Sequence, residues 1–90
     1  MVFKDLKFMP HPLTPHSAER AVVEFANGYG ASVVRVRDGE DWRCYELVVL
    51  AHRHICGTTP ITSDPLGDQS EEQITALLAR IEALPPAPKD

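Results

Sequence analysis

The sequence predicts a small α+β domain: an antiparallel sheet of three to five strands, built around a central β-hairpin, with one C-terminal α-helix packed on one face. Two observations carry this prediction. Alternating apolar residues flank an Asn27-Gly28 pair, which is the strongest short-range signal of a hairpin. Near the C-terminus, a capping-box sequence precedes large aliphatic residues at helical spacing, namely Ile74, Leu77, Leu78, Ile81 and Leu84.

The central hairpin is expected to join strands over residues 20–26 and 31–37. Asn27 and Gly28 both tolerate positive φ, as a tight connection requires. Loops of two or four residues would give the same faces, because a register shift of two residues preserves the alternation of side chains. We therefore expect the helix to pack on the face with Ala21, Val23, Phe25, Val34 and Val36, and the other face to carry Arg20, Val22, Glu24, Val33, Arg35 and Arg37.

The flanking segments complete a single domain over residues 1–84. Residues 1–19 are expected to form an irregular N-terminal arm, in which residues 2–8 could be an edge strand before a proline-rich loop. A fourth strand follows over residues 42–51, and residues 52–56 either continue it or begin a short fifth strand. Residues 63–69 have a turn-like composition, and residues 85–90 are expected to be a flexible tail after the helix.

Size and charge exclude several classes of function. A chain of 90 residues with 43% hydrophobic content forms one small domain, in which a deep enclosed active site is not expected. No apolar run is long enough to span a membrane, and charged residues interrupt the N-terminus, so we expect a soluble intracellular protein. The net charge of −4 lacks the basic surplus of nucleic-acid-binding proteins, so direct nucleic-acid binding is not expected.

The fourth predicted strand is apolar on both faces. Tyr45, Leu47 and Val49 alternate with Val48 and Leu50, as in a central strand that is covered twice. One helix can cover only one face. The other face is expected to meet either the N-terminal arm or a second chain, and the second alternative predicts a homodimer.

One cluster has the residue types of a metal site. His52, His54 and Cys56 would project to the same face of an extended strand, with His11, His16 or Cys44 completing the ligands. The alternative is a pair of exposed histidines at the end of a sheet. A Cys-His nucleophile is weakly indicated, because no orienting third group follows Cys56. We expect no enzyme activity, no catalytic residues and no cofactor.

Several exposed side chains are candidates for partner binding. Tyr29 at the hairpin tip and Trp42 near the next turn offer large contact areas, although each could instead fold back over the sheet. Acidic residues before and at the start of the helix could imitate phosphates in the basic groove of a partner, or could be an ordinary solvated face. These are Asp64, Asp68, Glu71 and Glu72.

Three segments together resemble a family of small uncharacterised phage and prophage proteins: residues 25–35 (FANGYGASVVR), 45–50 (YELVVL) and 59–64 (TPITSD). The chain departs from that pattern at residues 52–54 and in its short Asp38-Gly39-Glu40-Asp41 turn. The resemblance implies a phage context, and so a location in the cytoplasm of a bacterial host cell. Small acidic phage proteins of about this size often act by stoichiometric binding to host machinery.

The sequence and the resemblance together suggest three alternative functions. The leading expectation is a non-enzymatic inhibitor of a host defence complex, a protein or ribonucleoprotein such as a CRISPR effector, which would make this an anti-CRISPR protein. The first alternative is a homodimeric structural or regulatory phage protein. The second is a small metal-binding protein that uses His52, His54 and Cys56.

Overall fold

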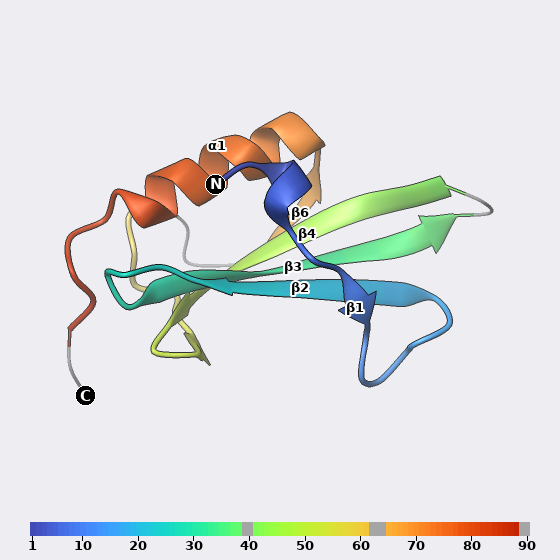
Figure 1. Cartoon of the computed structure of the whole chain (residues 1–90), viewed down its shortest axis with the longest axis horizontal. Coiled ribbons are helices and arrows are strands. Elements are labelled where there is room, and N and C mark those ends of the chain that lie inside the picture. The colour runs from blue at the N-terminus through green and yellow to red at the C-terminus, as the bar shows by residue number, and fades with distance from the viewer. Residues whose placement is uncertain (39–40, 62–64, 89–90) are drawn as a thin grey trace.

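The computed structural model describes residues 1–38, 41–61 and 65–88, and leaves the side chains of residues 38 and 41–44 undescribed. It confirms the predicted α+β fold, in which one C-terminal helix packs on an antiparallel sheet of order β1-β2-β3-β4-β5, with β6 also paired to β4 (Figure 1). The elements are η1 (Phe3–Asp5), β1 (Met9–Pro10), β2 (Ala18–Glu24), β3 (Tyr29–Asp38), β4 (Asp41–Ala51), β5 (His54–Ile55), β6 (Leu66–Gln69) and α1 (Glu71–Glu82).

The β2–β3 hairpin closes through a loop of odd length. The backbone N–H of Phe25 donates to the carbonyl oxygen of Tyr29 at 2.8 Å, and the N–H of Gly28 donates to the carbonyl of Phe25 at 3.1 Å. Gly28 has φ +87°, so the connection has the geometry of a turn followed by one left-handed residue. In this loop only Gly28 needs the conformational freedom of glycine, because Asn27 keeps a negative φ.

The odd loop reverses the predicted faces of β3. Ala21 pairs with Val33 and Val23 pairs with Ala31, so Val33 lies on the helix side with 0% of its surface exposed. Val34 and Val36 lie on the opposite side, where Val36 is 41% exposed. The prediction that the helix packs on these two valines is therefore wrong. It assumed a loop with an even number of residues, and one residue more or less in the loop moves every side chain of β3 to the other face of the sheet.

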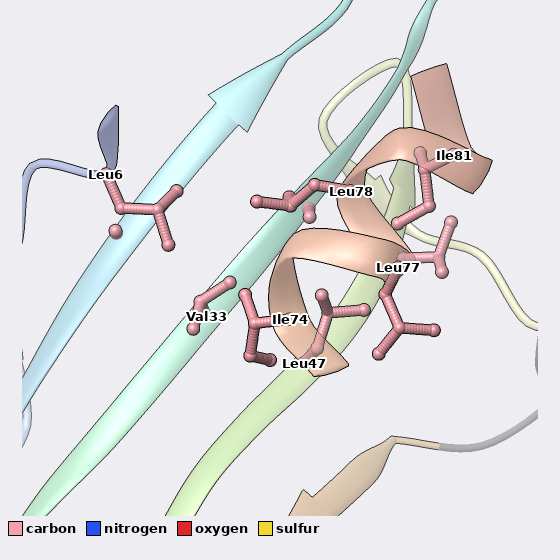
Figure 2. Close-up of a cluster of buried hydrophobic side chains, with 10 residues drawn as sticks. Leu6, Val33, Leu47, Ile74, Leu77, Leu78 and Ile81 are labelled. Atoms are coloured by element: carbon pink, nitrogen blue, oxygen red, sulfur yellow. The ribbon is translucent and has the colours of Figure 1, made fainter. Parts of the chain in front are cut away.

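The face that meets the helix is wholly apolar in the centre of the sheet, and we call it the covered face. Two cross-strand rows form it: Ala21, Val33 and Leu47 in one, and Val23, Ala31 and Val49 in the other. Four buried side chains of α1 pack against these rows (Figure 2), namely Ile74, Leu77, Leu78 and Ile81. Burying each large aliphatic side chain contributes about 1.5 to 3 kcal/mol, so the core of the domain lies here.

Both ends of α1 are fixed by specific hydrogen bonds. The predicted capping box is confirmed: the Ser70 hydroxyl accepts from the Gln73 N–H at 3.1 Å, and the Gln73 side-chain oxygen accepts from the Ser70 N–H at 2.7 Å. At the other end, the Asn27 amide nitrogen donates to the carbonyls of Ile81 at 2.9 Å and Leu84 at 3.1 Å. Among the described residues, no helix has both the length and the apolarity to cross a membrane.

Residues 85–88 differ from the flexible tail that the sequence predicts. The Ala87 N–H donates to the carbonyl of Asn27 at 2.7 Å, and Ala87 is only 9% exposed. The His52 ring nitrogen Nε2 lies 2.8 Å from the carbonyl oxygen of Pro88, to which it donates. The segment is therefore fastened across the tip of the β2–β3 hairpin.

The first part of the N-terminal arm, with η1, lies on the same side of the sheet as α1, and β1 then pairs with β2 at the sheet edge (Figure 1). The expected edge strand over residues 2–8 is absent, because Asp5 accepts the Val2 N–H at 3.0 Å and closes the short helix η1 instead. The Phe3 N–H donates to the Thr75 hydroxyl of α1 at 2.9 Å, and Leu6 joins the core at 8% exposure. Of the two expected covers for the second face, the arm does not supply one through Phe3 or Phe8, because both pack with the core on the helix side. Met9 instead lies opposite Arg20 at the sheet edge and is 65% exposed.

Two short strands pair with the outer side of β4. Residues 52–56 take the second of the two predicted alternatives, since β5 is a new strand with His54 opposite Ala51. Residues expected to be turns form β6, in which Leu66 pairs with Leu47 and packs partly buried against the core. The turn prediction for 66–69 is wrong because a single apolar residue, Leu66, is enough to dock this short strand.

Candidate functional site

The sheet surface opposite α1 carries the strongest candidate for a binding site, and we call it the open face. Within the described part of the chain, α1 and η1 lie on the other side of the sheet, and no arm residue lines the groove on this face. Val22 is 50% exposed, Val36 is 41% exposed and Ile55 is 78% exposed. A groove of about 570 Å³ crosses this face, lined by Arg20, Val22, Glu24, Ser32, Val48, Leu50, Arg53 and Ile55.

Charged side chains flank the apolar centre of the open face. Arg53 contacts Glu24 with 2.5 Å between Nε and Oε1, but the two side chains are 80% and 51% exposed, so this ion pair adds little stability. Arg20 is exposed and has no ion-pair partner among the described residues. The groove can therefore offer both an apolar floor and a free cationic group to a partner.

A second candidate surface is the acidic end of the molecule, which consists of Asp68, Glu71 and Glu72. All three residues are exposed, and the two glutamates occupy the first turn of α1, where the helix dipole favours negative charge. Lys4 from the arm lines the same shallow groove as the glutamates and offsets part of their charge. Asp64, the fourth predicted member, lies outside the described residues.

The predicted aromatic anchors do not join the acidic end. Tyr29 is half-buried and packs against the core, at the hairpin end where Asn27 contacts the C-terminus of α1. Glu71 and Glu72 are at the opposite end of that helix, which has 12 residues. Trp42 belongs to β4, but its side chain is outside the described part of the chain.

The predicted metal cluster rested on an extended backbone that the chain does not adopt there. His52 and Arg53 have φ +49° and +73°, so they form a two-residue turn between β4 and β5. The three side chains therefore do not follow the alternation of one strand. His52 contacts the chain near Pro88, while Cys56 contacts the hydroxyl of Thr58 at 3.4 Å. Across the described residues, no group of three metal-ligating side chains forms.

Arg35 lies at the edge of the covered face, and the prediction that placed it on the opposite face is wrong because the faces of β3 are reversed. Its Nε donates to Glu19 at 3.0 Å, and its guanidinium lies 3.9 Å from the centroid of the Phe8 ring. Nearby, burial raises the pKa of Tyr45 above its ordinary value, and the negative charge of Glu71 raises this pKa further. These contacts join the arm to the sheet, so we assign them a structural role.

Sequence reasoning missed the residues that build the open face as one site. Val22, Arg20 and Glu24 were placed together on one strand face, and β4 was recognised as apolar on both sides. The sequence did not reveal whether the β2–β3 loop has an even or an odd number of residues. That number decides whether Val34 or Val33 lies on the same face of the sheet as Val22. Arg53 and Ile55 join the groove only because β5 folds back along β4.

Comparisons of this chain with protein-family models, with curated proteins and with solved structures found no match.

Proposed function

We propose that this chain is a non-enzymatic binding protein that acts by stoichiometric contact with other protein molecules. The observation that carries the proposal is the open face, where large aliphatic side chains remain accessible around a groove. Contiguous exposed apolar surface is typical of interaction sites, and enclosing each such side chain contributes up to about 1.5 to 3 kcal/mol to an interface. Surface contact, and no reaction of its own, is thus the proposed mode of action.

The resemblance to small phage proteins supports one class of partner, a host defence complex such as a CRISPR effector. In that role the protein is an inhibitor that occupies a surface of the complex. The acidic end supports this role, because Asp68, Glu71 and Glu72 are exposed and complement a basic groove that otherwise holds nucleic acid. The net charge of −4 would favour encounter with such a groove.

The inhibitor role is tested by affinity capture from a bacterial lysate that contains a CRISPR effector. We expect an effector subunit at one-to-one stoichiometry with the chain. Combined replacement of Asp68, Glu71 and Glu72 by lysine should abolish capture, whereas the control Arg80→Glu, on the exposed side of α1, should leave it unchanged. Recovery of phage components alone would contradict this role, and unchanged capture by the triple variant would contradict use of the acidic end.

Contact through the open face is tested by Val22→Glu, which places a charge at the centre of the groove. We expect this variant to lose binding to its protein partner while its far-ultraviolet circular dichroism matches that of the wild type. Val22 is half exposed in the isolated chain, so the domain does not depend on its burial. Full retention of binding would contradict the assignment of the open face as a contact surface.

A homodimeric phage protein of structural or regulatory role is the second candidate function. The observation that favours it is the balance of charge on the open face, where two arginines and two glutamates surround the aliphatic centre. Arg20, Glu24, Glu46 and Arg53 form this set.

A further inference from the structure

We propose that the open face joins two copies of this chain about a twofold axis, which crosses the strands at the level of Val22. This inference rests on the proposed function, because it names the molecule that meets the contact surface. Two such sheets would pack face to face, about 10 Å apart and with their strands aligned to within about 30°.

The register divides the open face into three cross-strand rows. The pairing of β2 with β3 and of β3 with β4 defines the members of each row. The first row has charge at both ends, the middle row has none, and the third row has one acidic residue. The first row is Arg20, Val34 and Glu46; the middle row is Val22, Ser32 and Val48; the third row is Glu24, Gly30 and Leu50.

The first and third rows lie at equal distances from the middle row. Each is two residues away along its strands, which is about 7 Å in an extended chain. A twofold axis across the strands above the middle row therefore places the first row of one copy over the third row of the other. Under this operation Val22 meets the partner's Val22, so the most central exposed aliphatic side chain becomes buried in the pair.

The same operation matches charges and shapes in the outer rows. Arg20, which has no ion-pair partner among the described residues, meets the partner's Glu24. Val34 meets the partner's Gly30, where the absence of a side chain leaves room for it. Glu46 is brought to the row of Leu50, which is the end of the face where the turn carries Arg53.

A second copy of the chain matches the charges of the open face better than a partner that is wholly basic or wholly acidic. A basic partner would face Arg20 and Arg53, and an acidic partner would face Glu24 and Glu46, so either would set like charges together. A standard interface uses about 800 Å² of each partner, which is roughly one seventh of the 5932 Å² surface of this chain. One sheet face together with its β5 rim is a contact of that scale.

Reciprocal charge reversal tests the inference by sedimentation equilibrium. In a homodimer of Arg20→Glu, the new glutamate of each copy would face Glu24 of the other copy, which gives two acidic contacts. In a homodimer of Glu24→Arg, the new arginine of each copy would face Arg20 of the other copy, which gives two basic contacts. We expect each variant by itself to raise the dissociation constant of the dimer by at least about tenfold. A mixture of the two variants forms opposite-charge pairs at both contacts and should return to within about threefold of the wild type.

Two further samples complete the experiment. Arg80→Glu reverses a charge on the exposed side of α1 and should dimerise as the wild type does. Val22→Glu should be monomeric, because two carboxylates would meet at the axis, and its circular dichroism should match that of the wild type. Selective pairing of the two reciprocal variants would support this register, because a folding defect in either one cannot be repaired by mixing.

The failures of the two proposals are distinguishable. A wild-type chain that stays monomeric up to about 1 mM, or a dimer that Val22→Glu leaves intact, would overturn the second-copy inference. If that monomer still binds another protein and Val22→Glu abolishes the binding, the proposed function stands. If Val22→Glu instead leaves that binding unchanged, the second-copy inference and the assignment of the open face as a contact surface both fail, and binding through the acidic end is the part of the proposed function that stands.

Discussion

The two faces of the sheet use the same three strands for different purposes. On the covered face, the central rows of β2, β3 and β4 hold only aliphatic residues, and Ala31, Val33 and Leu47 are 0% exposed. On the open face, an uncharged row with Val22 lies between two rows that carry charged residues, and Val22 keeps half of its surface exposed. The difference shows that α1 makes one face the core of the domain, while the other remains available for contact.

The comparison also explains why β4 is apolar throughout. Leu47 and Val49 face α1, whereas Val48 and Leu50 face the open groove. Leu50 is only 7% exposed because Ile55 of β5 lies beside it, so the small fifth strand protects part of the open face without covering it. The two apolar faces of β4 therefore belong to the core on one side and to the proposed contact surface on the other.

The largest expected effect is on the free energy of unfolding, which should depend on side chains of the covered face much more than on those of the open face. Leu78→Ala removes a side chain that is 0% exposed between α1 and the sheet, and should lower the free energy of unfolding by about 2 to 5 kcal/mol through lost burial and a residual cavity. Val22→Thr keeps a β-branched shape on the open face and should change the monomer's stability by no more than about 0.5 kcal/mol. Denaturant titration at low protein concentration measures both, and equal losses would break the contrast.

The next effect comes from Gly30, a glycine of β3 that lies close to the backbone of β2. A Cβ atom on Gly30 would overlap the carbonyl oxygen of Val23, so Gly30→Ala should lower the free energy of unfolding by about 1 to 3 kcal/mol. Gly67→Ala is the matched control, because a Cβ atom there meets nothing within 4 Å and its φ is not positive. The control should be neutral or slightly stabilising by thermal unfolding. Equal effects would show that Gly30 is not held close to β2.

A smaller loss of stability is expected at the C-terminal end of α1, where Asn27 binds the last carbonyl groups of the helix. Asn27→Ala removes the amide that binds the carbonyls of Ile81, Glu82 and Leu84, and should lower the free energy of unfolding by about 1 to 2 kcal/mol. Asn27→Asp should be at least as damaging, because it replaces the donor with a charged acceptor that faces three oxygens. Chemical denaturation compares the two variants, and greater stability of Asn27→Asp would contradict this cap.

The smallest effect is the alkaline dependence of stability at the edge of the covered face. Burial raises the pKa of Tyr45 in the folded protein above its ordinary value of 10.0. As pH rises from 10.0 to the raised folded pKa, Tyr45 ionises in the unfolded chain first, so its contribution to stability is complete below this window and is lost across it. The free energy of unfolding of Tyr45→Phe should therefore fall less over the same pH range. Parallel slopes for both proteins would contradict this coupling.

The elements that interactions between near neighbours in the chain stabilise could be predicted from the sequence. The Ser70 to Gln73 capping box and the spacing from Ile74 to Ile81 specified α1, because hydrogen bonds and side chains within four residues of one another define a helix. The Asn27-Gly28 pair indicated the hairpin for the same reason. The double apolarity of β4 indicated a second surface to be covered, although nothing local could say by what.

Tertiary structure alone decided how these elements meet. One extra residue in the β2–β3 loop moved Val33 under α1 and Val34 to the open face, because strand faces alternate with every residue. Contacts with Thr75 drew the N-terminal arm to the helix side, and the positive φ angles of His52 and Arg53 turned the histidine segment back along β4. The open face arises from these long-range choices, since its rows belong to segments that are distant in the sequence and become neighbours only after folding.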